Sequence, residues 1–463
     1  MKIIVVGAGE VGTYVAERLN KQHDVALVEN NLERFREIDT DSSLDVLTVY
    51  GSGTDPDALS AAGLADTELL VAVTKNDEAN IVAALLARQA GVERTVVRIE
   101  SRRLRNKEVG KLLGSPGSFL MIDPDQEIAH DVQRLMKYPG ALDKIDMAGG
   151  EVVVISARLE ADAPFVGVSL HDLGKELEPD WDFIVGTITR CRDDIETTII
   201  PRQDETLQEG DLIRVICKNR ALDDVTHRLG IAFDSPDRAL LLGGGRTASM
   251  LAESLGKEGI SVAIIEKNLQ RATELSESLP GTTIFHGDIT DVDVLEEAEV
   301  GEQDVVVALT GEDDANVLAS LYAQDVGTRS ASGGKGKSGP QTIAVVHRLK
   351  LMPLLAAHDV GATLSPRTAT ANSVLRFVRG DVAQVATFLQ GEAEILEFAI
   401  HDDSRCEGKT IAEIGVPDKA LVAAIVRDGK PQIARGRSVL RDRDHVIVIA
   451  LPESADRVSE LFG

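Results

Sequence analysis

An internal repeat constrains the fold of this chain more than any other feature. The 463-residue sequence matches itself at a spacing of 236 residues. The matching pairs are GAGEVG at 7–12 with GGGRTA at 243–248, GSGTDPDAL at 51–59 with GDITDVDVL at 287–295, and TKNDEAN at 74–80 with TGEDDAN at 310–316. This period is far longer than the roughly 20–50 residues of solenoid repeats. The sequence therefore predicts a tandem duplication of one large unit.

Each copy begins with short aliphatic runs that are separated by stretches of helical periodicity. The runs are 3–7, 25–29, 69–74 and 95–99 in the first copy, and 239–243, 262–266, 304–310 and 343–349 in the second. Apolar strands that alternate with helices are typical of a doubly wound parallel sheet. An aromatic fraction of only 3% fits this class, because buried parallel strands favour branched aliphatic residues. We therefore predict an α/β fold with two Rossmann-like domains.

Both copies continue with a predicted helix whose first residue is a proline after a polar cap, at Asp123-Pro124 and Ser365-Pro366. The strand-rich segments that follow resemble each other in two places, 164–174 with 405–415 and 200–216 with 434–449. We expect four domains, two Rossmann domains and two small α+β modules, in the order 1–140, 141–232, 233–381 and 382–463. The insertion at 327–341 is rich in Gly, Ser and Lys, which predicts a flexible surface loop.

The first glycine motif, G-x-G-x-x-G at Gly7, Gly9 and Gly12, lies between a predicted strand and a predicted helix. Glycines there permit a tight turn and the close approach of a pyrophosphate to the helix N-terminus. Glu29 ends the next strand, 17 residues after Gly12, where a carboxylate accepts hydrogen bonds from an adenosine ribose and repels a 2′-phosphate. This context favours NAD(H) over NADP(H). The alternative is that the glycines serve only helix–strand packing.

The second glycine motif has alanine in its last place, at Gly243, Gly245 and Ala248, and Glu266 again ends the following strand. Arg246 alters the turn together with Thr247. An arginine beside the phosphates equally suits a nucleotide with more negative charge, so the two motifs are not required to bind the same ligand. Packing without a ligand is the alternative in this copy too.

The segments TKNDEAN and TGEDDAN follow the strand after which a doubly wound sheet places its ligand crevice. Thr74 and Thr310 are therefore predicted to line the nucleotide. For Asn80 and Asn316, helix N-capping is an alternative to ligand contact.

Arg98 follows a buried run and is predicted to reach the phosphates, with a surface ion pair as the alternative. His347 and Arg348 are expected to hold the matching place in the second copy. A third group, Asp123, Asp125, Glu127 and His130, permits a metal cluster, but acidic residues in a first helical turn are favoured by the helix dipole without any metal.

The overall charge and the absence of other motifs exclude several functions. The net charge of −27, from 49 basic and 76 acidic residues, opposes binding to nucleic acid and to anionic lipid. No apolar run approaches the roughly 20 residues that would span a bilayer, so no direct membrane insertion is expected. The sequence shows no Ser/His/Asp signature, no P-loop and no H-x-x-x-H pair, and we predict that the chain is not an enzyme. The cysteines match no metal or redox spacing, and Cys217 is expected to be a buried thiol.

The order of the domains and their motifs resembles the Trk potassium-uptake regulatory subunits, with tandem regulator-of-potassium-conductance domains, over essentially the whole chain. GAGEVG at 7–12, Glu29, GSG at 51–53 and VTKNDEAN at 73–80 carry this resemblance. It implies NAD(H), ATP or ADP as regulatory ligands. We assign ligand contacts to the motifs and to the residues that the resemblance adds: Gly7, Ala8, Gly9, Glu10, Val11, Glu29, Val73, Thr74, Arg98, Gly243, Gly244, Gly245, Arg246, Thr247 and Glu266.

The resemblance further implies a cytoplasmic protein, peripheral on the inner face of the cell membrane, that forms a homotetrameric ring beneath a separate potassium-translocating subunit. Two other classes remain as alternatives. An NAD-dependent oxidoreductase uses the same fingerprint but predicts a substrate domain with a general acid or base. A DNA-binding redox regulator predicts a basic recognition helix, which the sequence lacks.

Overall fold

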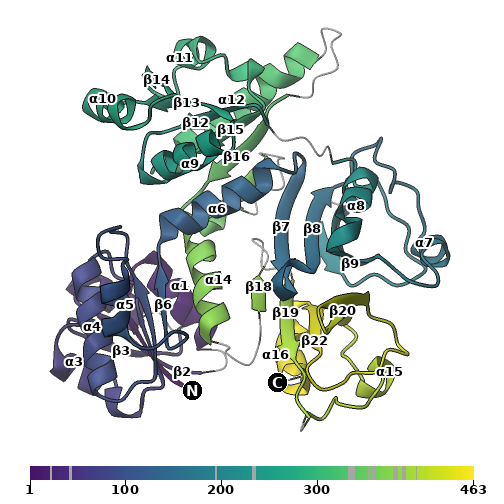
Figure 1. Ribbon diagram of the computed structural model, residues 1–463, viewed down its shortest axis with the longest axis horizontal. Coiled ribbons are helices and arrows are strands. Elements are labelled where there is room, and N and C mark those ends of the chain that lie inside the picture. Colours follow the sequence, from purple (N-terminus) through teal and green to yellow (C-terminus); the bar gives the residue numbers. More distant parts are fainter. Residues whose placement is uncertain are drawn as a thin grey trace. The chain divides into compact units, whose positions relative to one another are not determined.

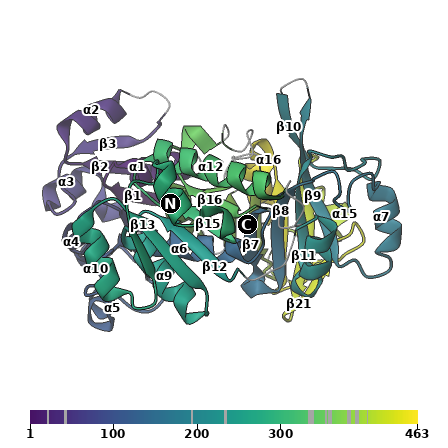
Figure 2. The same ribbon diagram turned by 90° about the horizontal axis from the view of Figure 1, so that it is seen from above.

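A computed structural model describes most of the chain. The described residues are 1–20, 23–40, 44–192, 195–231, 236–331, 339–352, 355, 361–378, 384–387, 393–402 and 404–462. The chain divides into two compact units, one of residues 1–128 with 365–380 and one of residues 129–364 with 381–463. Each unit therefore contains segments that lie far apart in the sequence, as the colours in Figures 1 and 2 show.

The first unit is built on a six-stranded parallel sheet in the order β3-β2-β1-β4-β5-β6. Its strands are β1 (Lys2–Val6), β2 (Asp24–Glu29), β3 (Leu47–Tyr50), β4 (Leu69–Ala72), β5 (Arg94–Arg98) and β6 (Phe119–Ile122). The connecting helices are α1 (Glu10–Leu19), α2 (Leu32–Asp39), α3 (Pro56–Ala61), α4 (Asp77–Gln89) and α5 (Lys107–Leu113). This is the strand order of a dinucleotide-binding sheet, and it confirms the predicted Rossmann fold.

The second unit contains a sheet of the same order, β14-β13-β12-β15-β16-β17, and all of its pairings are parallel. Its strands are β12 (Arg238–Leu242), β13 (Ser261–Glu266), β14 (Thr283–His286), β15 (Val305–Ala308), β16 (Gln341–Val345) and β17 (Ala362–Leu364). The helices are α9 (Arg246–Lys257), α10 (Leu269–Ser278), α11 (Val292–Glu297) and α12 (Asp313–Ala331). The predicted duplication is thus confirmed at the level of topology.

The helix that follows the last strand of each parallel sheet does not belong wholly to the same unit as that sheet. Helix α14 (Pro366–Val378) follows β17, yet Ala371, Val374 and Leu375 lie in one core cluster with Val15 of α1 (Figure 1). Helix α6 (Pro124–Met136) follows β6, and its C-terminal part belongs to the second unit. There the Gln133 side chain donates a hydrogen bond of 2.6 Å to Ser254 Oγ on α9. Both helices begin at the predicted proline.

Two small modules with antiparallel five-stranded sheets complete the second unit. The first has the order β10-β9-β11-β8-β7 and the second β18-β19-β22-β20-β21. The first contains β7 (Ala141–Met147), β8 (Val152–Arg158), β9 (Phe183–Arg192), β10 (Ile195–Ile199), β11 (Leu212–Lys218), α7 (Leu170–Glu176) and α8 (Leu222–Arg228). The second contains β18 (Gln384–Thr387), β19 (Glu394–Ala399), β20 (Ala420–Arg427), β21 (Lys430–Ile433), β22 (His445–Ala450), α15 (Ile411–Ile414) and α16 (Pro452–Phe462). These modules confirm the predicted α+β class.

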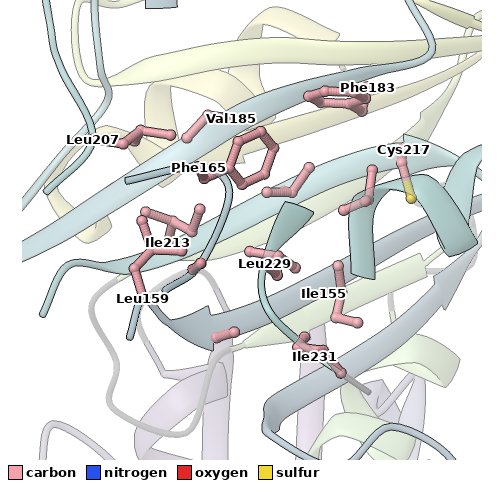
Figure 3. Packing of buried hydrophobic residues seen from close by; sticks show 14 of the residues in the cluster. Ile155, Leu159, Phe165, Phe183, Val185, Leu207, Ile213, Cys217, Leu229 and Ile231 are labelled. Atoms are coloured by element: carbon pink, nitrogen blue, oxygen red, sulfur yellow. The ribbon is translucent and has the colours of Figure 1, made fainter. Parts of the chain in front are cut away.

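The core of the first module includes Phe165, Phe183, Ile213 and Cys217 (Figure 3). Cys217 is fully buried, as predicted, and this burial raises the pKa of its thiol to about 12. The thiol therefore stays protonated near neutral pH and packs as an apolar group.

The predicted loop at 327–341 is partly wrong. Helix α12 continues to Ala331, and β16 begins at Gln341, so both ends of the segment are regular structure. The segment 332–338 lies outside the described residues. The glycine and serine content of residues 327–341 does not prevent α12 from extending into them, because helix propensity is a weak signal over a few residues.

Candidate nucleotide-binding sites

The first glycine loop joins β1 to α1, and its three glycines differ in what a side chain at each position would contact. Gly7 has a φ of +96°, and a Cβ there would lie 2.8 Å from Thr74 Cγ2. A Cβ on Gly12 would lie 1.8 Å from the Gly7 carbonyl oxygen, so this glycine permits close contact between helix and loop. Gly9 precedes the first residue of α1, and a Cβ there would meet nothing within 4 Å. Packing thus explains Gly7 and Gly12 but leaves Gly9 without a packing role.

Glu29, at the end of β2, holds the loop through both oxygens of its carboxylate. Oε2 accepts a hydrogen bond of 2.7 Å from the Ala8 N–H, and Oε1 accepts one of 2.7 Å from the Asn31 N–H. The carboxylate is thus fixed beside the glycine loop, as the prediction of a ribose-binding acid requires. Each carboxylate oxygen has a further lone pair for the hydroxyl groups of a ligand.

The second loop repeats this geometry. Gly243 has a φ of +104°, and a Cβ there would lie 2.8 Å from Thr310 Cγ2. Gly245 precedes α9 and, like Gly9, has open space around its Cβ position. Glu266 accepts hydrogen bonds from the N–H groups of Gly244 at 2.8 Å and Asn268 at 2.7 Å. The two loops therefore present the same arrangement of open helix N-terminus and carboxylate.

An arginine in each copy supports the loop and was not predicted. Arg34 Nε donates to the Ala8 carbonyl at 2.9 Å, and Arg271 Nε donates to the Gly244 carbonyl at 2.9 Å. The available signal is the pattern Asn-Leu-x-Arg at 31–34, which recurs at 268–271 with a spacing of 237 residues. These arginines belong to the candidate sites as groups that position the loop.

Thr74 and Thr310 lie after β4 and β15, beside the first glycine of each loop, and a buried asparagine holds each of them. Asn80 Oδ1 accepts from the Thr74 N–H at 3.0 Å and from its hydroxyl at 2.6 Å, while Asn80 Nδ2 donates to the carbonyls of Thr74 and Arg98 at 2.9 Å each. Asn316 makes the same set of bonds. Helix capping, named as the alternative, is not observed for Asn80, because the cap of α4 is Asn76 and Asn80 joins the ends of two strands. Contact of Asn80 and Asn316 with a ligand remains a prediction.

We predict that Asn80→Ala destabilises the first unit by about 2–3 kcal/mol, because it leaves several buried backbone groups without partners. Replacing the cap residue, in Asn76→Ala, should cost only about 1 kcal/mol. Urea unfolding, with hydrogen exchange to locate the change at β4 and β5, measures both. Equal losses in the two variants would contradict the bracing role of Asn80.

The two sites differ at the end of the fifth strand. Asn80 binds the Arg98 carbonyl, whereas Asn316 binds the Val345 carbonyl, so Val345 is the counterpart of Arg98. The expectation that His347 and Arg348 hold this place is therefore wrong, because the insertion before β16 hides the register in the sequence. Arg98 Nε donates to Glu100 Oε1 at 3.0 Å, which is the ion pair named as the alternative to phosphate contact. Contact between Arg98 and a phosphate remains a prediction.

His347 and Arg348 instead bind the buried Asp313 at the start of α12. Their backbone N–H groups each donate to its carboxylate at 2.8 Å. Burial acts to raise the pKa of Asp313, but these hydrogen bonds outweigh it, and the pKa is lowered. Such a carboxylate stabilises the fold above its unfolded pKa near 4, and this contribution is lost as the pH falls through the folded value.

Asp313→Asn is accordingly expected to destabilise the second parallel-sheet domain at pH 7, and the difference from the native chain should shrink as the pH falls below about 4. Urea unfolding at pH 7, 5 and 3 tests this dependence. Asp314→Asn is the matched control, since the Asp314 side chain is 83% exposed and its ion pair is expected to add little. A difference that stays constant over this range would contradict the role of the Asp313 charge.

The other predicted site residues occupy different depths. Val11 and Val73 are buried, so their side chains belong to the core and leave only backbone groups for a ligand. Glu10 is exposed at the first position of α1, and Arg246 takes the equivalent position of α9, followed by Thr247. The charge at the two helix starts is therefore opposite, as the sequence indicated.

The acidic group at the start of α6 has protein partners. Asp123 Oδ1 accepts from the Asp125 N–H at 3.2 Å, and Asp123 pairs with Arg105 at 2.7 Å. Glu127 accepts from the Ser373 hydroxyl at 2.7 Å. Within the described residues, no group of three or more His, Cys, Asp or Glu side chains is arranged to hold a metal ion.

A cavity of about 490 Å³ in the second unit lies between the two small modules. Charged groups at its wall have partners: Lys218 Nζ lies 2.7 Å from Asp180 Oδ1, and Arg435 pairs with the neighbouring Glu178. The Arg435 guanidinium also lies 5.1 Å from the ring centre of Trp181. The contacts of Arg435 with Glu178 and Trp181 thus join the two modules.

The sequence matches known proteins over its full length. Residues 3–111 and 239–364 match the TrkA-N domain, and residues 154–230 and 395–463 match the TrkA-C domain. A Trk system potassium uptake protein TrkA homolog of Methanosarcina mazei is 33% identical over all of both chains. The TrkA of Halomonas elongata is 31% identical over the whole chain and 98% of the relative, and that of Vibrio alginolyticus 32% identical over 97% and 95%.

Solved structures resemble the fold at lower identity. The GsuK RCK domain superposes with a TM-score of 0.59 at 16% identity, covering the whole chain and 94% of that protein. A GsuK channel bound to NAD gives the same TM-score at 17% identity and covers the whole chain and 78% of the channel. None of the helices in the described part of this chain has the length and apolar character needed to span a bilayer.

Proposed function

Since the chain belongs to the TrkA family of potassium-uptake proteins, we propose that it is the nucleotide-binding regulatory subunit of a Trk-type potassium uptake system. The observation that carries this proposal is the pair of open glycine loops, each with a fixed carboxylate at the end of the following strand. The regulatory ligands are NAD(H), ATP or ADP. The oxidoreductase alternative gains no support, because the relatives are named as potassium uptake proteins.

The geometry of Gly9 and Gly245 supports nucleotide binding over packing alone. Both glycines precede a helix, neither has a side chain to cap the first N–H groups, and both leave open space where a Cβ would stand. The backbone N–H groups of a helix N-terminus attract phosphate. The carboxylates of Glu29 and Glu266 then receive the ribose.

The two sites are proposed to prefer different ligands. The first has Glu10 at the helix start and Arg98 at the end of β5, whereas the second has Arg246 and Val345 at these places. The cation in the second site therefore lies at the helix start and not at the strand end. We assign NAD(H) to the first site, and to the second a nucleotide whose phosphates carry more charge.

The proposed assembly is a homotetrameric ring on the inner face of the cell membrane, bound to a potassium-translocating membrane subunit. The family resemblance supports this assembly. Ligand binding regulates transport only if the open and closed arrangements bind the nucleotide with different affinity. Reorientation of the Rossmann domains on ligand binding would then act on the membrane subunit.

Rubidium uptake into proteoliposomes that contain the cognate membrane subunit tests this proposal. With the full chain present inside the vesicles, we expect NADH or ATP to change the initial uptake rate by about 5-fold or more. The rate with each nucleotide is compared with the rate with the other nucleotide and with the rate without nucleotide. Vesicles without the chain control for direct effects of nucleotide on the membrane subunit. An initial uptake rate that changes neither with the chain nor with the nucleotide would rule out a regulatory role.

A further inference from the structure

An ion pair at the start of α1 joins the two halves of the sequence within the first unit. Arg367, the second residue of α14, donates from Nε to Glu10 Oε2 at 2.8 Å, and its NH2 group also contacts Glu10 Oε1. The Arg367 side chain is only 18% exposed, whereas that of Glu10 is 57% exposed. The arginine is therefore held, and the carboxylate is the more accessible partner.

The packing of α14 fixes the position of Arg367. Helix α14 packs against α1 in one apolar cluster, and at its far end the Val378 carbonyl accepts a hydrogen bond of 2.9 Å from Arg94, the first residue of β5. Its C-terminus thus lies at the beginning of the strands and its N-terminus at their carboxyl ends. Two helix N-termini, of α1 and α14, meet at the edge that carries the glycine loop.

The charges at this edge conflict with a bound phosphate unless they rearrange. Glu10 directly follows Gly9, so its carboxylate lies beside the helix N-terminus where the pyrophosphate is expected. Two like charges in contact repel each other, and a cation between them removes the conflict. A bidentate arginine suits phosphate oxygens as well as it suits a carboxylate.

We infer that Arg367 is a residue of the first nucleotide site, and that it exchanges Glu10 for a ligand phosphate when the site is filled. This inference rests on the proposed nucleotide binding of the first loop. The second site has its own cation, Arg246, at the position of Glu10, and it does not need one from another helix. Helix α14 follows the second parallel sheet in the chain, so the second half of the sequence supplies a residue of the first site.

Calorimetric titration with NADH and ATP tests the inference in the full chain carrying Glu266→Ala, so that only the first site is titrated. Arg367→Gln should weaken binding of both nucleotides about 10- to 100-fold, as the loss of a charge-assisted hydrogen bond predicts. Glu10→Gln should strengthen binding, because it frees the arginine and removes a negative charge. Neither change should alter the affinity for adenosine, which has no phosphate.

Arg94→Gln is the matched control, since Arg94 holds the opposite end of α14 and its guanidinium lies 4.6 Å from the Phe377 ring centre. It should leave nucleotide affinity unchanged. If Arg367→Gln and Glu10→Gln both lower the melting temperature and leave affinity unchanged, or change it in the same direction, the pair is only a packing contact and the inference fails. If the native chain binds no nucleotide at all, the proposed function fails with it.

Discussion

Gly12→Val is expected to abolish nucleotide binding at the first site and to destabilise the first unit by about 3 kcal/mol or more. A Cβ at position 12 would lie 1.8 Å from the Gly7 carbonyl oxygen and 3.3 Å from Val73 Cγ2. The carbonyl is backbone and cannot rotate away, so α1 must move off the loop. Urea unfolding and calorimetric titration with NADH measure the two effects.

Gly9→Ala separates the two roles of the same loop. Gly9 has a φ of −67°, which alanine adopts freely, and its Cβ would meet no protein atom within 4 Å. We expect a stability change within about 1 kcal/mol, together with weaker nucleotide binding, because the methyl group enters the space proposed for the phosphates. Unchanged binding in Gly9→Ala would support the packing-only interpretation of the motif.

Glu29→Ala is expected to weaken NADH binding at the first site by about 100-fold or more. The variant removes two hydrogen bonds from the ribose to a charged group, each worth roughly 1.5–3 kcal/mol. It also frees the N–H groups of Ala8 and Asn31, which hold the loop in place. Glu266→Ala should have the same effect on the second site alone, so calorimetry of the two variants assigns each ligand to its site.

Glu33→Ala is the control for Glu29→Ala, since Glu33 is an exposed glutamate in the first turn of α2. It leaves the loop contacts in place and should bind NADH as the native chain does. If Glu29→Ala kept its affinity, the ribose would not bind at this carboxylate, and the adenosine end of the site would have to be placed elsewhere.

Local patterns were sufficient to predict the Rossmann sheets and their loops. The strand at 25–29 corresponds to β2 (Asp24–Glu29), and both capped prolines begin helices, because these signals depend on residues close in sequence. The strands β3, β6, β14 and β17 were not predicted. They have three or four residues each, and such short runs carry little periodic signal.

Contacts between distant segments could not be predicted in the same way. The apolar face of α14 has the same pattern whichever sheet it covers, so the sequence did not indicate that it packs on the first sheet. The pair of Arg367 with Glu10 depends on this packing. Likewise, the match of Arg98 with Val345 became visible only from the bonds that Asn80 and Asn316 make to strand ends.

Calorimetric titration of the purified full chain with NADH, NAD, ATP and ADP shows whether both glycine loops bind nucleotide. We expect saturable binding of a nucleotide at each of the two loops, with binding at one loop lost in Glu29→Ala and at the other in Glu266→Ala. Absence of binding by the native chain to all four nucleotides would contradict this expectation. The glycine loops would then serve only to pack helix against strand, and regulation by nucleotide would have no input.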